Sequence, residues 1–378
     1  MAAYTTMLDF HVDSSVIGDD EKVKILKQHI QAVLSEWGFH KEVVIESCPG
    51  FIMFLQGEKE SHGVIRAYPN GFVTITLEEG IETQEPRLSP VASKCIQQNI
   101  QERLKLDKIK RYAAMKRGGP IDQYIATSDN RIVEYDFDKI VYEADSPYQN
   151  IKILHSPSFG NLLVLDDLQN LAESDLIYTQ SLMKYGNESY EGKEVLILGG
   201  GDGALLHELL KENPKFVTMI EIDKMVMDAC RIYLRSACGD CLDKLKGPNY
   251  EIIIDDCVKM MNRYIEENRT FDYVFGDLTD IPITPTPQGE FWDFMRHILE
   301  LSMKILRPTG KYLTHGTGIN AVQSQQMYED QLQNLSVPIT FAKHTAHVPS
   351  FMETWVFYEV KKVAIANGVA HDIGEYGQ

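Results

Sequence analysis

The stretch that decides the fold is Val195-Leu-Ile-Leu-Gly-Gly-Gly-Asp-Gly203, followed at once by Ala204-Leu-Leu-His-Glu-Leu-Leu210. An unbroken apolar run is typical of a strand buried in a parallel sheet, and the second segment has the spacing of an amphipathic helix. Glycines between such a strand and helix form a tight turn at which nucleotide ligands bind. The spacing of Gly199, Gly201 and Ala204 fits a dinucleotide fingerprint only loosely, so alone it is a weak signal.

Two acidic residues change the kind of ligand expected at this turn. Asp202 lies inside the loop, where a carboxylate would repel the pyrophosphate of a dinucleotide. Glu221 ends the next expected strand, about 20 residues further on, where an acid hydrogen-bonds ribose hydroxyls. Together they favour an adenosyl sulfonium such as S-adenosylmethionine or a derivative. The alternatives are a plain NAD site and a glycine loop kept for packing.

Strands and helices alternate from Lys193 onward, which predicts a Rossmann-like, doubly wound α/β domain. The expected strands are 194–198, 216–221, 251–254, 271–275, 311–315, 339–343 and 353–358, with helices near 203–212, 224–234, 258–267, 290–306 and 321–335. Acidic residues follow four successive strands, namely Asp202, then Glu221 and Asp223, then Asp255 and Asp256, then Asp277 and Asp280. The carboxyl ends of these strands share one edge of the sheet, so we expect the acids to surround the ligand. For Asp256, capping of the next helix explains the acid equally well.

The chain before and after this domain is expected to form three further parts. Residues 1–117 predict an α+β domain with helices over 20–37 and 91–106 and a hairpin turning at Pro69-Asn70-Gly71. Residues 118–175 predict a small antiparallel β unit. The catalytic domain then spans 176–365, beginning with a helix that carries Tyr178, and 366–378 is expected to be a disordered tail.

Composition narrows the class of partner. A net charge of −18 opposes nucleic acid and anionic membranes and attracts cations. The basic segment 103–119, ending in Gly-Gly-Pro, is therefore interpreted as a solvated linker. No apolar run approaches the ~18 residues of a membrane span and the N-terminus does not resemble a signal peptide, so we expect a cytoplasmic protein.

Six cysteines give no disulfide framework, and Cys238-Gly-Asp-Cys241 is a single pair without the further ligands of a zinc site.

Two segments near the ends of later strands suit a substrate amine. Strand alternation places Glu353 and Trp355 on one face, and a carboxylate beside an indole binds an alkylammonium by ion pairing and cation–π contact. From the residues alone, a core tryptophan beside a solvated glutamate is the favoured interpretation. The proline-rich loop 277–287 is expected to close over a substrate.

The chain from about residue 120 to 360 resembles the polyamine aminopropyltransferases. The matching motifs are Ser-Pro-Tyr-Gln149, Gly-Gly-Gly-Asp-Gly203, Glu221-Ile-Asp223, Asp256 and Asp277-Leu-Thr. The segment 66–71 resembles part of the extra N-terminal domain of the animal spermine synthases within that family, and 348–358 is similar to their last segment.

This resemblance implies transfer of an aminopropyl group from decarboxylated S-adenosylmethionine to spermidine, giving spermine and methylthioadenosine. It implies a homodimer joined through the N-terminal domain and no metal. It implies that Gln149, Glu221 and Asp256 bind the nucleoside and that Tyr178, Asp202, Asp277 and Glu353 bind the amine. We also expect Gly200, Asp202 and Asp223 in the nucleoside site and Trp355 in the amine site. Catalysis would involve Asp277, Tyr178 and Asp202. An amine with a pKa near 10, like that of lysine, must lose a proton before it attacks, and Asp277 is the expected acceptor.

Two rival functions remain at this point. The spacing of Asp277 and Asp280 is typical of spermidine synthases, which use putrescine, and leaves that reaction as the enzymatic alternative. A catalytically inactive polyamine-binding scaffold is the alternative of another class. A methyltransferase is disfavoured.

Overall fold

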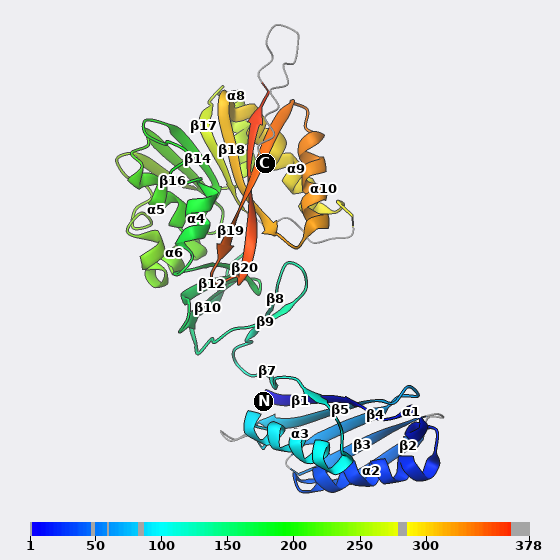
Figure 1. The fold of residues 1–378 in the computed structure, drawn as a ribbon. Helices are drawn as coiled ribbons and strands as arrows, with labels where there is room; N and C mark the ends of the chain where they lie inside the picture. Colours follow the sequence, from blue (N-terminus) through cyan, green and yellow to red (C-terminus); the bar gives the residue numbers. More distant parts are fainter. Residues whose placement is uncertain (1, 47–49, 59, 82–86, 279–285, 364–378) are drawn as a thin grey trace. The chain divides into compact units, whose positions relative to one another are not determined.

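The computed structural model describes residues 2–46, 50–58, 60–81, 87–278 and 286–363. Contacts divide the chain into two compact units, Met1–Gln123 and Tyr124–Gln378, which are described separately (Figure 1). Within the described ranges, no helix combines the length and the apolar character needed to cross a bilayer.

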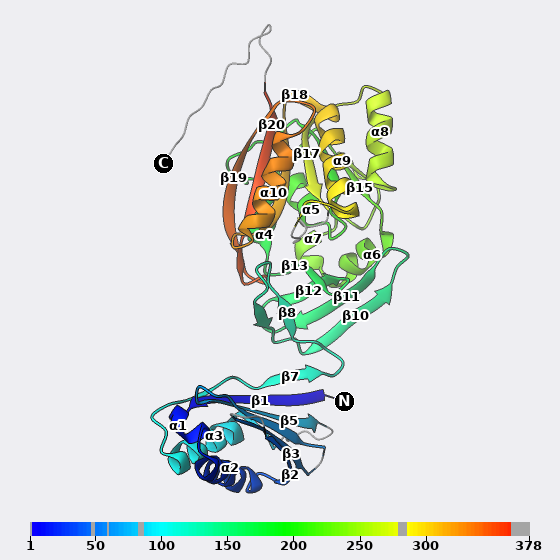
Figure 2. The same ribbon diagram turned by 90° about the vertical axis from the view of Figure 1, so that its right-hand side faces the viewer.

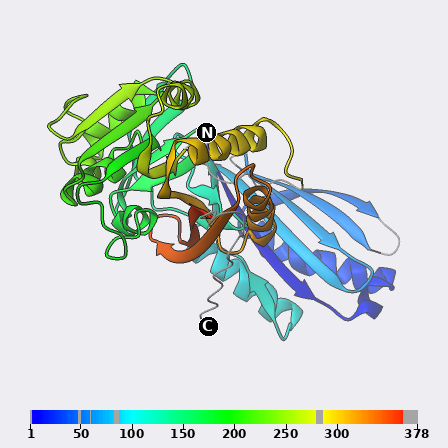
Figure 3. The ribbon, with the colours of Figure 1, turned by 90° about the horizontal axis from the view of Figure 1, so that it is seen from above.

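The first unit is an antiparallel sheet with helices on one face. The strand order is β2-β3-β4-β5-β1-β6, and β7 also pairs with β1. The strands are β1 (Ala2–His11), β2 (Phe39–Glu46), β3 (Phe51–Gly57), β4 (His62–Ala67), β5 (Phe72–Ile81), β6 (Ile109–Arg111) and β7 (Met115–Gly118), and the helices are α1 (Ser14–Ile17), α2 (Asp20–Ser35) and α3 (Pro90–Leu104). Helices α2 and α3 cover the same face of the sheet (Figure 3), and the core between them includes Leu8, Ile30, Ile75 and Ile100. The predicted hairpin is confirmed, because β4 and β5 pair across a turn closed by the Gly71 N–H to the Tyr68 carbonyl at 3.0 Å.

The basic segment 103–119 was interpreted wrongly as a solvated linker. Strands β6 and β7 both pair with β1, Arg117 forms an ion pair with Glu78, and Arg111 donates to the Ser93 hydroxyl at 3.2 Å. Strands of three and four residues are too short to show a clear alternation of apolar and polar residues. Their lysines and arginines are also typical of a solvated segment, which favoured the wrong interpretation.

The second unit begins with small antiparallel sheets, as expected. Strands β8 (Tyr124–Ala126) and β9 (Ile132–Glu134) form a hairpin. A four-stranded sheet follows in the order β10 (Lys139–Asp145), β11 (Asn150–Ser156), β12 (Gly160–Leu165) and β13 (Leu168–Ala172).

The expected doubly wound α/β fold forms the rest of the second unit. The seven-stranded sheet has the order β16-β15-β14-β17-β18-β20-β19, with β14 to β18 parallel and β20 antiparallel to both its neighbours. Its strands are β14 (Glu194–Gly199), β15 (Phe216–Glu221), β16 (Tyr250–Ile254), β17 (Phe271–Asp277), β18 (Leu306–Gly318), β19 (Ile339–Val348) and β20 (Glu353–Lys362). Its helices are α4 (Leu176–Leu182), α5 (Ala204–Lys211), α6 (Lys224–Tyr233), α7 (Arg235–Cys238), α8 (Cys257–Glu266), α9 (Glu290–Ile305) and α10 (Val322–Gln333). One apolar core packs α4, α5 and α6 on one face of the sheet, and a second packs α8, α9 and α10 on the other (Figure 2).

Candidate active site at the carboxyl edge of the parallel sheet

The glycine loop follows β14 and packs against the end of the neighbouring strand β17. Gly199 and Gly200 have φ of 82° and 77°, a region that favours glycine. A Cβ at Gly199 would lie 2.1 Å from the Asp277 carbonyl oxygen, and the Gly200 N–H donates to that same oxygen at 3.1 Å. The end of β14 is thereby held against the end of β17, which only glycine allows.

Two carboxylates flank this loop. A Cβ at Gly201 would lie 2.8 Å from Glu221 Oε2, and one at Gly200 would lie 3.4 Å from Asp277 Oδ2. The glycine bend therefore runs between acids delivered by β15 and β17. Such a bend is suited to a cationic ligand and disfavours a phosphate.

Glu221 is almost fully buried and its ionisation is perturbed. Its Oε1 accepts a hydrogen bond from the Asp223 N–H at 2.7 Å. Burial, and then the nearby charges of Asp223 and Asp202, raise the pKa of Glu221 to about 7. The buried acid holds its charge poorly unless a cation or further donors arrive.

Asp223 connects the parallel sheet to the small β sheet. Its Oδ2 accepts from Gln149 Nε2 at 3.1 Å and from the Ser146 hydroxyl at 2.6 Å, while its Oδ1 caps α6 by accepting from the Met225 N–H at 3.0 Å. Gln149 and Asp223, both predicted site residues, thus lie in contact. Ser146 was not predicted as a site residue, although it opens the Ser-Pro-Tyr-Gln motif.

Asp202 lies one position before the N-cap residue Gly203 and accepts a hydrogen bond from the first residue of α5. Its Oδ1 accepts from the Ala204 N–H at 2.7 Å at the start of α5. Burial of the carboxyl group raises the pKa of Asp202. Its position inside the loop is as expected, while its role toward a ligand stays a prediction.

Asp256 is the residue directly before α8. It is exposed, and its Oδ1 accepts from the Val258 N–H at 2.7 Å, so it caps α8. Strand β16 nevertheless ends beside β15, because the Asp255 N–H donates to the Glu221 carbonyl at 3.2 Å. The capping explanation describes the contact that Asp256 makes here, and its contact with a nucleoside remains a prediction.

Tyr178 belongs to an aromatic cluster beside β18 and β20. Its ring centroid lies 5.8 Å from His315, 5.8 Å from Phe351 and 6.4 Å from Trp355. Sequence reasoning missed His315, which directly follows Thr314, the register partner of Gly276 on β17. Burial lowers the pKa of His315 to about 4, so the ring is neutral near pH 7.

Glu353 and Trp355 line one cavity of about 110 Å³, as strand alternation predicted. The interpretation of a solvated glutamate was wrong. Glu353 is 7% exposed and accepts from the Ser128 N–H at 3.1 Å and the Ser128 hydroxyl at 3.0 Å. Trp355 is equally buried, and its Nε1–H has no hydrogen-bond partner among the residues that the structure describes.

Part of the predicted site lies outside the described residues. Asp280 and most of the proline-rich loop fall in 279–285, outside the described residues. Among the residues that are described, no three His, Cys, Asp or Glu side chains are grouped as ligands of one metal ion would be. Five of the six cysteines lie in the described ranges, and all five are free thiols.

The sequence comparisons identify a family. Residues 175–370, more than half of the chain, match the family described as "Spermine/spermidine synthase domain", and residues 122–173 match "Spermidine synthase tetramerisation domain". The polyamine aminopropyltransferase of Escherichia coli O1:K1 is 34% identical over 192 residues, which are 50% of this chain and 62% of that protein. The Escherichia fergusonii protein of the same name is 30% identical over 219 residues, or 57% and 71%. The chain thus spans less than two thirds of the length of the first of these relatives.

Solved structures show the same fold. The spermidine synthase of Thermotoga maritima is similar with a TM-score of 0.50 at 19% identity, over 65% of this chain and 79% of that one. A spermidine synthase in complex with the transition-state analogue AdoDATO gives 0.51 at 20% identity, over 65% and 80%. From the extent of the family match, the chain belongs to the spermine/spermidine synthase family.

Proposed function

We propose that the protein is an aminopropyltransferase that transfers the aminopropyl group of decarboxylated S-adenosylmethionine to spermidine, giving spermine and methylthioadenosine. The observation that carries this proposal is the glycine bend between Glu221 Oε2 and Asp277 Oδ2. Both co-substrates are cations, and a bend between two carboxylates attracts them and disfavours a dinucleotide.

The nucleoside would lie on the β15 side of the bend. Glu221 is at the strand end where an acid accepts hydrogen bonds from ribose hydroxyls. Gln149 and Asp223, already hydrogen-bonded to each other, would form the adjoining wall. Gly200, Asp202 and Asp256 are assigned to the nucleoside from the family motifs.

The acceptor amine would lie on the β17 side. Its nitrogen attacks the carbon next to the sulfonium, the new C–N bond forms as the C–S bond breaks, and the sulfur leaves as a neutral thioether with the electron pair. The proton from the amine passes to Asp277, with Tyr178 and Asp202 helping to orient the amine. The sulfonium is already an activated leaving group, so the main contributions of the protein are alignment and proton removal. Glu353 and Trp355 would hold the distal ammonium group by charge and cation–π contact.

Spermidine is preferred as acceptor because residues 1–117 resemble the extra domain of the animal spermine synthases. We further propose that this domain joins two chains into a homodimer, that 118–175 is a linking β unit, and that 176–365 is the catalytic domain. A second candidate is a spermidine synthase that uses putrescine, because the solved relatives named above are spermidine synthases.

One assay separates the candidates. Purified protein is incubated with labelled decarboxylated S-adenosylmethionine and either putrescine or spermidine, and the labelled polyamines are separated by chromatography. We expect spermine from spermidine and little product from putrescine. Product from putrescine alone would refute the choice of acceptor. Binding of spermidine without turnover, unchanged in Asp277→Asn, would favour the inactive scaffold instead.

A further inference from the structure

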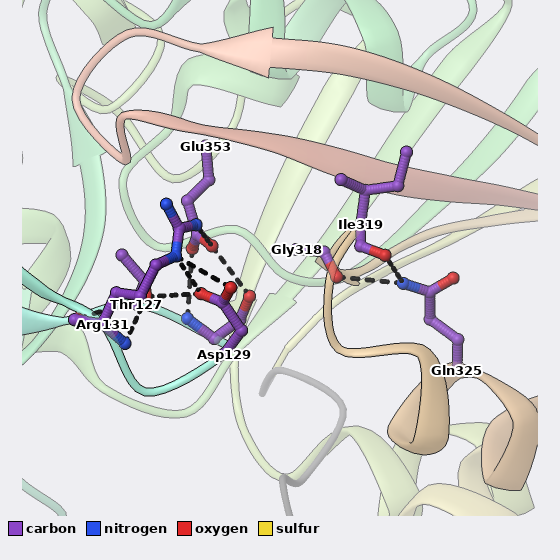
Figure 4. Close-up of polar contacts among 8 residues, drawn as sticks. Thr127, Asp129, Arg131, Gly318, Ile319, Gln325 and Glu353 are labelled. Carbon is purple, nitrogen blue, oxygen red and sulfur yellow. Dashed lines mark hydrogen bonds and ion pairs between the residues drawn. The ribbon is translucent and has the colours of Figure 1, made fainter.

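The β8–β9 hairpin carries a rigid loop at residues 127–131. The Thr127 N–H donates to the Arg131 carbonyl at 2.8 Å, and the Arg131 N–H donates to Thr127 Oγ1 at 2.9 Å. Thr127 Oγ1 also donates to Asp129 Oδ1 at 2.7 Å, and Arg131 Nε donates to both carboxylate oxygens of Asp129 at 2.8 Å (Figure 4). The loop therefore holds its shape, and the Arg131 guanidinium keeps a defined direction.

This loop reaches the carboxylate that begins β20. Ser128 donates twice to Glu353, and an Arg131 terminal nitrogen lies 3.5 Å from Glu353 Oε1 (Figure 4). The Glu353 side chain is 6% exposed, whereas that of Arg131 is 57% exposed. The pair thus joins a buried anion to a cation whose other side is in water.

Gly318 makes room for this contact. A Cβ there would lie 2.0 Å from the Ser128 hydroxyl and 2.9 Å from Glu353 Oε1. The carbonyl oxygens of Gly318 and Ile319 are fixed by Gln325 Nε2 at 2.9 and 3.1 Å. The wall behind Glu353 is therefore rigid, and the carboxylate is confined between Ser128, Arg131 and the cavity.

Glu353 is shared between Arg131 and the cavity that it lines with Trp355. A carboxylate has about four acceptor sites, so the two Ser128 bonds leave capacity for another donor. A polyamine ammonium entering the cavity would meet the same oxygen atoms as Arg131, and the two cations would repel each other.

We propose that Arg131 is an internal counter-ion that competes with the distal ammonium of the bound polyamine for Glu353, and so limits how tightly the site holds its amines. This inference rests on the proposed function. Displacement of Arg131 is easy because an ion pair with one exposed partner contributes little, and because Asp129 keeps the guanidinium paired afterwards. The distal ammonium is present in both spermidine and spermine, so Arg131 would weaken the binding of substrate and product alike.

The test compares Arg131→Gln and Arg131→Met with Arg131→Lys, which keeps the charge. Arg263→Gln is the matched control, because Arg263 is an exposed arginine of α8 in an ion pair with Glu267. Dissociation constants of spermidine and spermine are measured by calorimetry with methylthioadenosine present, at low and moderate salt. We expect both neutral variants to bind spermidine and spermine about 2- to 5-fold more tightly, with a steeper salt dependence. Lysine at 131 and Gln at 263 should leave binding near that of the unaltered protein.

A second comparison ties the effect to one carboxylate. In a Glu353→Gln background, Arg131→Gln should no longer tighten binding, because the carboxylate for which Arg131 and the ammonium compete is then absent. Unchanged or weaker binding in both neutral variants, with an active unaltered protein, would overturn the role of Arg131 and leave the proposed function standing. If the unaltered protein binds no polyamine, both proposals fail.

Discussion

Glu221→Gln should make the ligand-free protein more stable, and only at higher pH. The pKa of Glu221 is raised from 4.5 to about 7 by burial and by neighbouring acids. Between these values the folded chain keeps a proton that the unfolded chain releases, so the free energy of unfolding falls as the pH rises through this window. The whole shift corresponds to about 3 kcal/mol at 1.36 kcal/mol per pH unit. Because Gln cannot ionise, the free energy of unfolding of the variant does not fall in this pH window for this reason.

The measurement is urea unfolding at pH 5, 6, 7 and 8. A Trp37→Phe background leaves only Trp292 and Trp355, both buried in the second unit, as fluorescent reporters. We expect the advantage of Glu221→Gln to grow with pH and to level off above pH 7, at up to about 3 kcal/mol. Gln preserves the Oε1 acceptor of the Asp223 N–H, so the hydrogen bond at 2.7 Å is not the cause of any difference.

The control is Glu267→Gln, which removes an exposed acid paired with Arg263 at 2.6 Å. Exposed pairs contribute little, so this variant should follow the unaltered protein at every pH. An advantage of Glu221→Gln that stays constant from pH 5 to pH 8 would refute the reasoning, because it would show that Glu221 does not titrate in this window. The same variant should bind methylthioadenosine more weakly if Glu221 contacts the ribose.

Three further outcomes are expected. Asp277→Asn should lower kcat by about 10²- to 10⁴-fold while methylthioadenosine affinity stays within a few-fold, measured by steady-state kinetics and calorimetry; an unchanged kcat would remove Asp277 as the base. Gly201→Ala should melt within a few degrees of the unaltered protein but bind the nucleoside at least 10-fold more weakly, because its Cβ meets the Glu221 carboxylate at 2.8 Å, and full affinity would contradict this arrangement. Phe54→Lys, on the exposed face where Phe54 pairs with the exposed Val43, should shift sedimentation toward the monomer if the first unit joins the dimer; an unchanged dimer would place the interface elsewhere.

The parts of the fold that the sequence predicted well are those whose signal is local. Strand β14, its glycine turn and helix α5 lie within 18 residues, and their apolar pattern and glycines decide them directly. Strands β6 and β7 were missed because their pairing partner is β1, about a hundred residues earlier in the chain, and their own residues are mostly basic or polar. Short edge strands depend on such distant partners for their structure.

The same distinction between local signals and distant contacts applies to the candidate site. The order of strands brings Asp277 and Glu221 to one edge, so their proximity followed from topology alone. The contact of Glu353 with Ser128 joins residues 225 positions apart, and nothing in either segment indicates the other. The burial of Glu353 was therefore predicted wrongly, since a glutamate without a visible partner is ordinarily solvated.

The arrangement of acids at the glycine bend opposes stability in a way that a cationic ligand would relieve. Burial raises the pKa of both Glu221 and Asp202, and the charge of Asp202 adds to the upward shift of Glu221. A neutral residue at either position would be more favourable for folding, so packing alone does not explain them. Glu353 differs, because Arg131 and Ser128 supply donors to it from within the chain. Within the described part of the chain, neither Glu221 nor Asp202 forms an ion pair, whereas Glu353 at the distal end is paired with Arg131. On this reasoning the ligand should be bound most strongly where the chemistry takes place and held more loosely at its far end, where it must leave.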